Sequence, residues 1–263
     1  MRNHSLACIG IIASSLIYNQ VNGQMNGIVL ELKFPEPPLL YMEENSIYLS
    51  VRNESDHPLP LMTSLQKAIK YQIKIDLGLG SIPYRYQHLP VYYQSVSWDD
   101  IVTLADKVLK PGQSHIWEWE GYGLMEYPNL LSEISNSSAT NIAISLRVEN
   151  NQWVSTPPLP ITVLTAKASK AITDKAVPVL ETTFWNQFTG QSWPISLNKL
   201  EINGKTYLFT PFGTRICELP NGEIPTIQND VKGTGFTLTF PTTQRRVRYN
   251  TNKMKIEADD IPK

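Results

Sequence analysis

Apolar and polar residues alternate along much of this chain. The period of two that is typical of half-buried strands occurs in residues 28–34, 46–52, 71–76, 141–149 and 160–165. Turn-forming stretches rich in proline, asparagine, aspartate and glycine separate these segments, as at 35–38, 53–60 and 109–113. Short strands at this spacing are typical of an antiparallel sandwich. The pattern therefore predicts an immunoglobulin-like β-sandwich over residues 24–165.

The alternation is lost between residues 166 and 178, where the sequence AKASKAITDKAVP is rich in alanine and lysine. This composition indicates a linker or a short helix, and the boundary between two domains is placed there. One further helix is expected at residues 127–135.

Shorter strands return after the linker and are joined by hairpin signals. Asn203-Gly204 separates residues 200–202 from 205–209, and both turn residues tolerate the positive φ of a type I′ turn. The same signal recurs at Asn221-Gly222, between segments 215–219 and 223–228, and the segments 235–240 and 245–249 are expected to form a further pair. Residues 179–263 are thus predicted to be a small antiparallel sheet or barrel with a charged tail, which makes the whole chain all-β.

The N-terminus has the composition of a secretory signal peptide. Arg2 precedes an apolar run over residues 6–18, and a polar stretch ends at Gly23. About 13 apolar residues are too few to span a bilayer, which needs about 20. Cleavage after Gly23 is expected, leaving residues 1–23 out of a mature chain that has no transmembrane segment. The predicted location is secreted, periplasmic or at the cell surface.

Charge and cysteine content exclude several classes of function. The chain has a net charge of −1, which provides no long-range attraction for nucleic acid. Of its two cysteines, Cys8 lies in the expected leader, so Cys217 remains alone and is interpreted as a buried small hydrophobe. The three histidines outside the leader are too few to favour a structural zinc site. No metal and no cofactor are expected.

The motifs of common enzymes are also missing from the sequence. It contains no Gly-x-Ser-x-Gly, no His-Glu-x-x-His and no glycine-rich phosphate loop. Glu118 and Glu120 are the most evident carboxylate pair, but neighbours on one strand face point the same way, whereas glycosidase carboxylates flank the bond that they cleave. The protein is therefore predicted to be non-catalytic.

Asp99, Asp100 and Asp106, with Glu118 or Glu120, offer oxygen atoms of the kind that calcium prefers. An Asp-x-Asp-x-Asp-Gly loop is absent, and Asp99-Asp100 is interpreted instead as the cap of a turn or a short helix.

The candidate ligand-binding residues are aromatic. Exposed rings stack on sugars or grip an extended peptide, whereas buried rings fill the sandwich core and its ends, and the sequence leaves both alternatives open. In the segment HIWEWEG (115–121), Trp117 and Trp119 share one strand face and are expected to enter the core, with His115 beside them. The candidates are Tyr84, Tyr86, Tyr92, Tyr93, Trp98, Trp117, Trp119 and Tyr122.

A second candidate surface is basic. Arg246 and Arg248 share one face of a predicted strand, while Arg245 lies on the other face with Val247 and Tyr249. This strip either contacts an anionic partner or is a solvated edge strand whose charges discourage edge pairing. The main hypothesis is a non-catalytic interaction module with a protein or glycan partner at the cell surface. A carbohydrate-binding protein that uses aromatic residues of segment 84–127 is the alternative.

The chain over residues 46–120 resembles bacterial secreted immunoglobulin-like modules and, in particular, is similar to the bacterial intracellular proteinase inhibitor family. The likeness lies in Asn53-x-Ser55-x-x-Pro58 at a strand end and in Leu109-x-Pro111-Gly112 before a tryptophan-containing strand. It implies a further alternative, inhibition of a protease by a loop such as 84–97. The chain departs from the family in its leader, its tyrosine-rich insertion and its second domain, so no inhibitory residues carry over. Residues 179–263 resemble no family that we can name.

Overall fold

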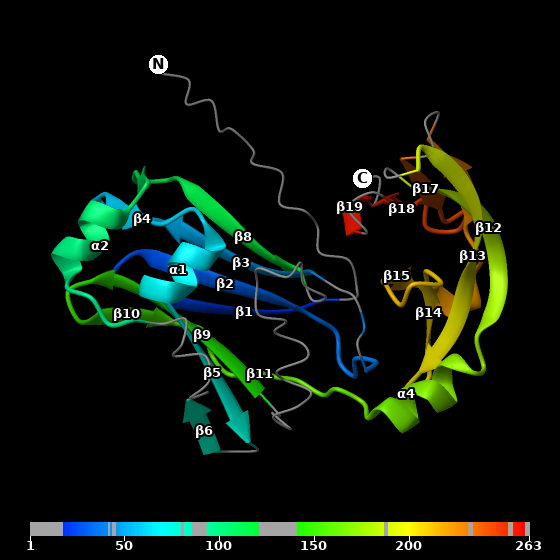
Figure 1. Cartoon of the computed structure of the whole chain (residues 1–263), viewed down its shortest axis with the longest axis horizontal. Helices are drawn as coiled ribbons and strands as arrows, with labels where there is room; N and C mark the ends of the chain where they lie inside the picture. The colour runs from blue at the N-terminus through cyan, green and yellow to red at the C-terminus, as the bar shows by residue number, and fades with distance from the viewer. Residues whose placement is uncertain are drawn as a thin grey trace. The chain divides into compact units, whose positions relative to one another are not determined.

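The computed structural model describes residues 18–41, 43, 46–79, 82–85, 94–120, 141–186, 189–230, 234–251 and 255–260 of the 263-residue chain. These residues form two compact units, one covering 18–170 and the other running from residue 171 onward (Figure 1). Antiparallel sheets dominate both units, so the all-β prediction is confirmed.

Two sheets make up most of the first unit. The strands of one are β1 (Tyr18–Met25), β2 (Ile28–Pro35), β3 (Ser46–Asn53) and β8 (Ser114–Glu120), in the order β1-β2-β3-β8. The strands of the other are β5 (Ile73–Leu79), β6 (Ile82–Arg85), β9 (Asn141–Glu149), β10 (Gln152–Ser155) and β11 (Leu159–Pro160). Their order is β10-β9-β5-β6, and β11 also pairs with β9. A separate two-stranded sheet joins β4 (Leu59–Leu61) to β7 (Lys107–Leu109).

The apolar faces of the two large sheets share one core. On β2, Leu30, Leu32 and Phe34 are completely buried, whereas the alternating Glu31 and Lys33 are only partly covered. Buried residues of β3, β5, β8, β9 and β10 belong to the same cluster. Burial of one side of each strand is the physical origin of the alternating pattern, and the unit is sandwich-like.

Two short helices are described in the first unit, one unpredicted and one at Asp99-Asp100, where a turn or a short helix is expected. They are α1 (Leu65–Tyr71) and α2 (Trp98–Leu104). Because α1 occupies residues up to Tyr71, the strand predicted at 71–76 begins two residues later, at Ile73. The helix predicted at 127–135 falls outside the described residues.

The strand predicted at 160–165 is present only in its first residue. β11 ends at Pro160, and beyond it Leu39 forms a single parallel bridge with Val163. The Leu39 amide donates to the carbonyl of Thr162 at 2.8 Å, and the Leu164 amide donates to the carbonyl of Leu39 at 2.8 Å. One residue cannot continue a ladder, so this segment is extended without being a strand of the sheet.

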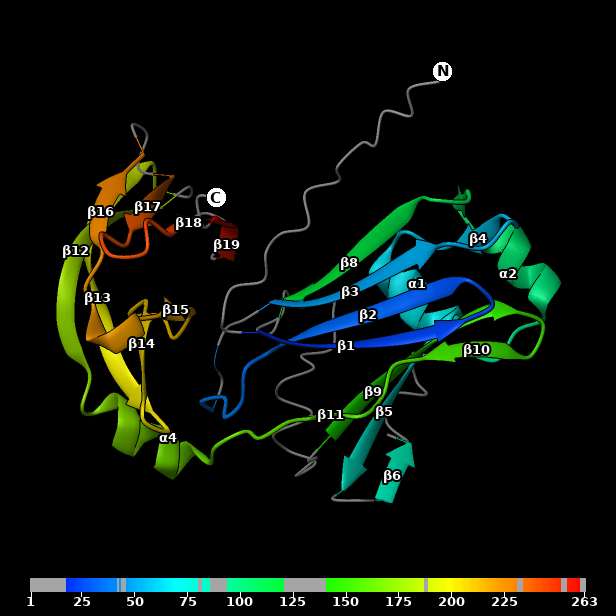
Figure 2. The same ribbon diagram turned by 180° about the vertical axis from the view of Figure 1, so that it is seen from behind.

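The described part of the second unit contains one α-helix, α4 (Ala166–Thr173, which begins in the first unit's range), and two four-stranded sheets (Figure 2). The first sheet has β12 (Val177–Asn186), β13 (Gln191–Ile202), β14 (Lys205–Phe209) and β15 (Arg215–Glu218) in sequence order. The second has β16 (Thr226–Asn229), β17 (Gly235–Thr239), β18 (Arg246–Asn250) and β19 (Lys255–Asp260). A short 3₁₀ turn, η2 (Pro220–Gly222), lies between the sheets in the chain.

One predicted hairpin of this unit is confirmed and one is wrong. Asn203 and Gly204 have φ values of 52° and 76° and join β13 to β14 in the expected type I′ geometry. Asn221 and Gly222 also have positive φ, 51° and 72°, but the strands on either side belong to different sheets. Asn221-Gly222 is therefore a turn, as predicted, but it lies in η2 between two sheets and does not close a hairpin. The pair β17–β18 and the helix in the linker agree with the sequence.

Strand β1 begins inside the segment expected to be a leader. Its residues pair with β2 from Tyr18 opposite Pro35 to Met25 opposite Ile28. At Gly23 an added Cβ would lie 1.9 Å from the Ser155 carbonyl oxygen, so only glycine fits there. Cleavage after Gly23 stays a prediction, and it would remove six residues of this strand. In the described part of the chain, no helix is both long enough and apolar enough to cross a membrane.

Candidate functional site

The two tryptophans of the HIWEWEG segment lie in the core. On β8, Trp117 and Trp119 are 2% and 1% exposed, and they stand opposite Leu49 and Ile47 of β3. The Trp117 indole Nε1 donates to the Met62 carbonyl at 3.0 Å, and the His115 ring meets the Trp117 ring edge-on at 4.9 Å. Neither indole is available to a ligand. This corrects the candidate binding role of Trp117 and Trp119 and agrees with the core alternative.

The remaining aromatic candidates are placed differently. Tyr84 lies on β6, where its backbone alone is described, and Tyr86, Tyr92, Tyr93 and Tyr122 lie outside the described residues, as does most of the loop 84–97. The structure therefore does not bring the predicted aromatic cluster together.

Trp98 is partly buried and stacks near a buried arginine. The Arg147 guanidinium carbon is 5.9 Å from the centre of the Trp98 ring, and Nη1 donates to the Val96 carbonyl at 2.7 Å. Arg147 is 5% exposed and fixes the segment that leads into α2. In the sheet that contains Arg147, the Lys74 ammonium lies 3.9 Å from the centre of the Trp153 ring, a close cation–π contact. Trp98 thus packs against the protein itself.

The Glu118 carboxylate takes part in a polar cluster on the outer face of β3 and β8. The Ser46 hydroxyl donates to its Oε1 at 2.8 Å, and Tyr48 is its direct cross-strand neighbour. Burial, with a smaller contribution from the charge of Glu118, raises the pKa of Tyr48 to about 12. The Glu120 side chain is outside the described part.

The aspartates considered as calcium ligands stabilise local structure. Ser97 and Asp100 form a reciprocal capping box at the start of α2, and the hydrogen bonds from Ser97 lower the pKa of Asp100. Asp106 accepts a hydrogen bond from the Thr63 amide at 2.7 Å, which lowers its pKa. The interpretation as a helix cap is confirmed for Asp100, whereas Asp99 lies in the first turn without capping it. Among the described residues, no three histidine, cysteine, aspartate or glutamate side chains gather in a way that would hold a metal ion.

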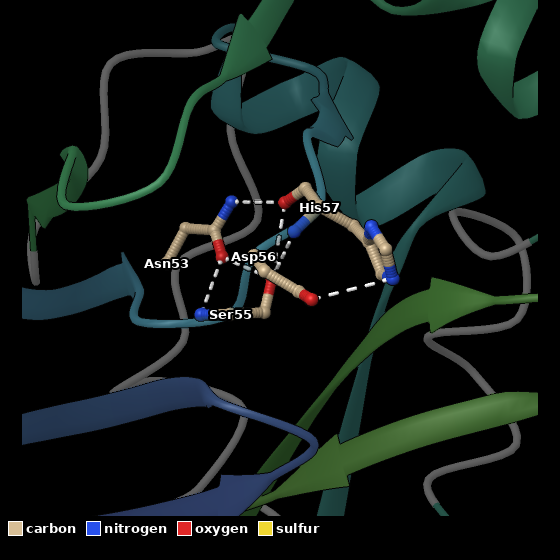
Figure 3. Close-up of polar contacts among 4 residues, drawn as sticks. All are labelled: Asn53, Ser55, Asp56 and His57. Carbon is tan, nitrogen blue, oxygen red and sulfur yellow. Dashed lines mark hydrogen bonds and ion pairs between the residues drawn. The ribbon is translucent and has the colours of Figure 1, made fainter.

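The two motifs that carry the family resemblance meet at one residue, the buried Asn53. Figure 3 shows its contacts within the first motif, with Ser55 and His57. Its Nδ2 donates to the carbonyls of His57 and Leu109, each at 2.8 Å, and its Oδ1 accepts from the amide and hydroxyl of Ser55. Its backbone binds the 109–113 turn as well, because the Gly112 amide donates to the Asn53 carbonyl at 2.6 Å. One amide therefore holds both turns together. The neighbouring Asp56–His57 ion pair, 3.3 Å long, is almost fully exposed and adds little.

The arginine strip is divided by the fold. Arg246 and Arg248 are exposed on β18, but β18 pairs with both β17 and β19 and is not the edge strand of the prediction. Arg245 is 3% exposed, and its guanidinium lies 5.5 Å from the centre of the Phe240 ring. Arg248 bonds to Asp230 at 2.9 Å and to Glu257 at 3.4 Å, so its charge is already matched. The predicted three-residue anion-binding strip is therefore wrong for Arg245. Cys217 is fully buried in the second core, as expected.

A different aromatic group is exposed, and the sequence analysis did not identify it. Phe184 of β12 and Trp193 of β13 are directly opposite in the strand register, so their side chains share a face. Phe212, from the turn between β14 and β15, brings its ring to 5.2 Å from that of Phe184. Trp193 and Phe212 are 50% and 46% exposed. We call Phe184, Trp193 and Phe212 the hairpin aromatic surface.

This surface continues a face that is buried further along the hairpin. On β13, Leu197 is completely buried, Ile195 is partly buried and Trp193 is half exposed, and these three residues alternate onto the same side of the strand. The sheet that contains β16 contacts β12 at Thr182, whose hydroxyl donates to the Asn229 side chain of β16. The row of Leu197, Ile195 and Trp193 thus extends past the point where we see the second sheet cover it.

The two sequence segments that carry the surface contain polar residues and no charged ones. From Thr182 to Asn198, and from Thr206 to Thr214, the sequence contains no aspartate, glutamate, lysine or arginine. Gln191, on the same side of β13 as Trp193, and Ser192 are exposed. This combination of aromatic rings with a long charge-free stretch is the sequence signal that would have identified the surface.

No protein-family model, curated protein or solved structure matches this chain.

Proposed function

We propose that this protein is a non-catalytic binding module at or outside the cell surface, and that its ligand contacts the hairpin aromatic surface. The observation that supports the proposal is the exposure of Trp193. All six tryptophans are described, and Trp193 is the one among them that is exposed. A half-exposed indole grouped with two phenylalanine rings offers a flat apolar contact to a ligand.

Two features of the sequence support the other parts of the proposal. The apolar N-terminal segment supports export, and the lack of nucleophile, metalloprotease and phosphate-loop motifs supports a binding role. For the first unit, we infer an immunoglobulin-like relationship from the Asn53 and 109–113 turns, whose bonding accounts for both motifs of the resemblance.

The test is a binding panel on the intact chain with three classes of probe: a glycan array, a peptide array and lipid vesicles of neutral and anionic composition. The comparison is between the parent, Trp193→Ala and a matched control. Trp185→Ala is the control because Trp185 lies opposite Ser192, on the other face of the same hairpin. Binding of at least one class that Trp193→Ala abolishes and Trp185→Ala retains supports the proposal. Absence of any Trp193-dependent binding overturns it.

A further inference from the structure

We infer that the hairpin aromatic surface recognises a neutral glycan. The inference rests on the proposed function, since it names the class of ligand for the same surface. It is carried by the chemistry that surrounds the three rings, by their size and by their position at the end of a covered apolar row.

The charge pattern separates neutral from charged ligands. Anionic and cationic ligands derive much of their affinity and orientation from ion pairs and charge-assisted hydrogen bonds. No charged residue occurs in the 182–198 segment that carries Phe184 and Trp193, nor in the 206–214 segment that carries Phe212. An acidic polymer, a basic peptide or a charged headgroup would find no opposite charge within these two segments. A neutral ligand does not need ion pairs, so the lack of charge does not weaken its binding.

The polar side chains match the hydroxyl groups of a sugar. A pyranose has apolar C–H faces and a rim of hydroxyl groups that both donate and accept hydrogen bonds. Trp193 offers a flat ring for such a face, and Gln191, which alternates onto the same side of the strand, offers an amide with both a donor and an acceptor. Ring stacking beside an amide therefore suits one sugar ring and its rim.

The size of the surface favours a glycan over a folded protein partner. A Trp or Phe side chain carries about 150–250 Å² in all. With Trp193 and Phe212 about half exposed, the two rings present roughly 200 Å². A stable protein interface buries about 800 Å² on each partner. The exposed rings cover a small part of that area, whereas one or two sugar rings fit them.

The experiment is affinity electrophoresis of the full chain through gels that contain one soluble polysaccharide each. The neutral probes are a β-glucan, a mannan and a xylan, and the acidic probes are polygalacturonate and alginate. We expect retardation by at least one neutral probe, insensitive to added NaCl. Trp193→Ala should weaken it by about 30-fold or more, as at an interface hot spot, and Gln191→Ala by a smaller factor. Trp185→Ala and Ile224→Ala, the latter removing an exposed apolar side chain elsewhere in the unit, should bind as the parent does.

Two results would overturn the inference, and they differ in their consequence. Trp193-dependent binding confined to acidic polysaccharides, peptides or vesicles would refute the neutral glycan and leave the proposed function standing. No Trp193-dependent binding of any class would refute both. Circular dichroism and the unfolding midpoint of each variant establish that a loss of binding is not a loss of folding.

Discussion

The two units treat their tryptophans in opposite ways. On β8 of the first unit, Trp117 and Trp119 alternate with polar residues and are buried beneath the opposing sheet. On β13 of the second unit, Trp193 alternates in the same manner with Ser192 and Pro194, yet half of its surface remains in water. Alternation therefore tells which residues share a face of a strand. It does not tell whether a second layer covers that face.

The largest expected effect is at the buried end of this comparison. Trp117→Ala removes a fully packed indole together with its hydrogen bond to the Met62 carbonyl. We expect it to lower the free energy of unfolding by about 3–5 kcal/mol, measured by urea denaturation. A loss below about 1 kcal/mol would contradict the core position of this side chain.

The next effect concerns the amide that joins two turns of the first unit. Asn53→Ala leaves the His57 and Leu109 carbonyls without their Nδ2 donor. The expected loss of stability is about 1–3 kcal/mol, as for a buried hydrogen-bonding group whose partners remain. Asp56→Asn, in the same loop but in an exposed ion pair, is the matched control and should change stability by less than about 0.5 kcal/mol. Equal effects of the two substitutions would show that Asn53 does not join the turns.

A smaller effect is expected from pH, because His115 packs against Trp117. Burial, and to a lesser degree the charge of Lys107, lowers the pKa of His115 below 6.5, although the Thr63 carbonyl and Asp106 act in the opposite direction. As pH falls through 6.5, the unfolded chain binds a proton before the folded chain does, so folding stability decreases. The unfolding midpoint followed from pH 7 toward the lower folded pKa should fall less steeply in His115→Gln than in the parent.

His57→Gln changes a histidine on the exposed loop and serves as the control for that series. It should keep the slope of the parent chain. The aspartates act in a separate range, because Asp100 and Asp106 have pKa values lowered from 3.8 and their contribution is lost as pH falls below that value. A slope between pH 7 and 5 that His115→Gln leaves unchanged would refute the assignment.

The smallest effect on stability is expected at the exposed end of the comparison. Trp193→Ala should change the free energy of unfolding by about 1 kcal/mol or less. The substitution removes the cross-strand contact with Phe184 but little buried apolar surface, because the indole is half exposed. Quenching by iodide sharpens the contrast, because Trp193→Phe should reduce the quenchable fraction of fluorescence far more than Trp117→Phe. A larger loss of quenching with Trp117→Phe would reverse the assignment of the exposed ring.

The strands that the sequence predicted best are those covered on one side only. β2 and β3 show apolar alternation because one face of each meets the core. The helices α1 and α2 have only seven residues each, too few for helical periodicity to exceed the strand signal of their surroundings. β12 and residues 191–199 of β13 are not predicted, since four consecutive residues of β13, from Gln191 to Pro194, are exposed and show no alternation in burial.

The candidate site was harder to predict for a related reason. The densest aromatic segment of the sequence contains Trp117 and Trp119, and both are buried. The exposed rings come from three strands or turns separated by up to 28 positions, so only the sheet register and the β14–β15 turn bring them together. Exposure depends on where the second sheet ends, which no local pattern contains.

The burial of Cys217 allows the opening of the second unit to be measured separately from that of the first. Residues 18–170 contain no cysteine, and Cys217 lies with Leu208 and Phe236 in the core of the second unit. In a Cys8→Ser chain, the rate of modification by a thiol reagent would report how often that core opens. The first unit would give no signal, because it has no thiol to react. The modification rate of Cys217 thus reports the opening of the second unit alone. Comparing it with the rate of global unfolding shows whether the two units unfold together.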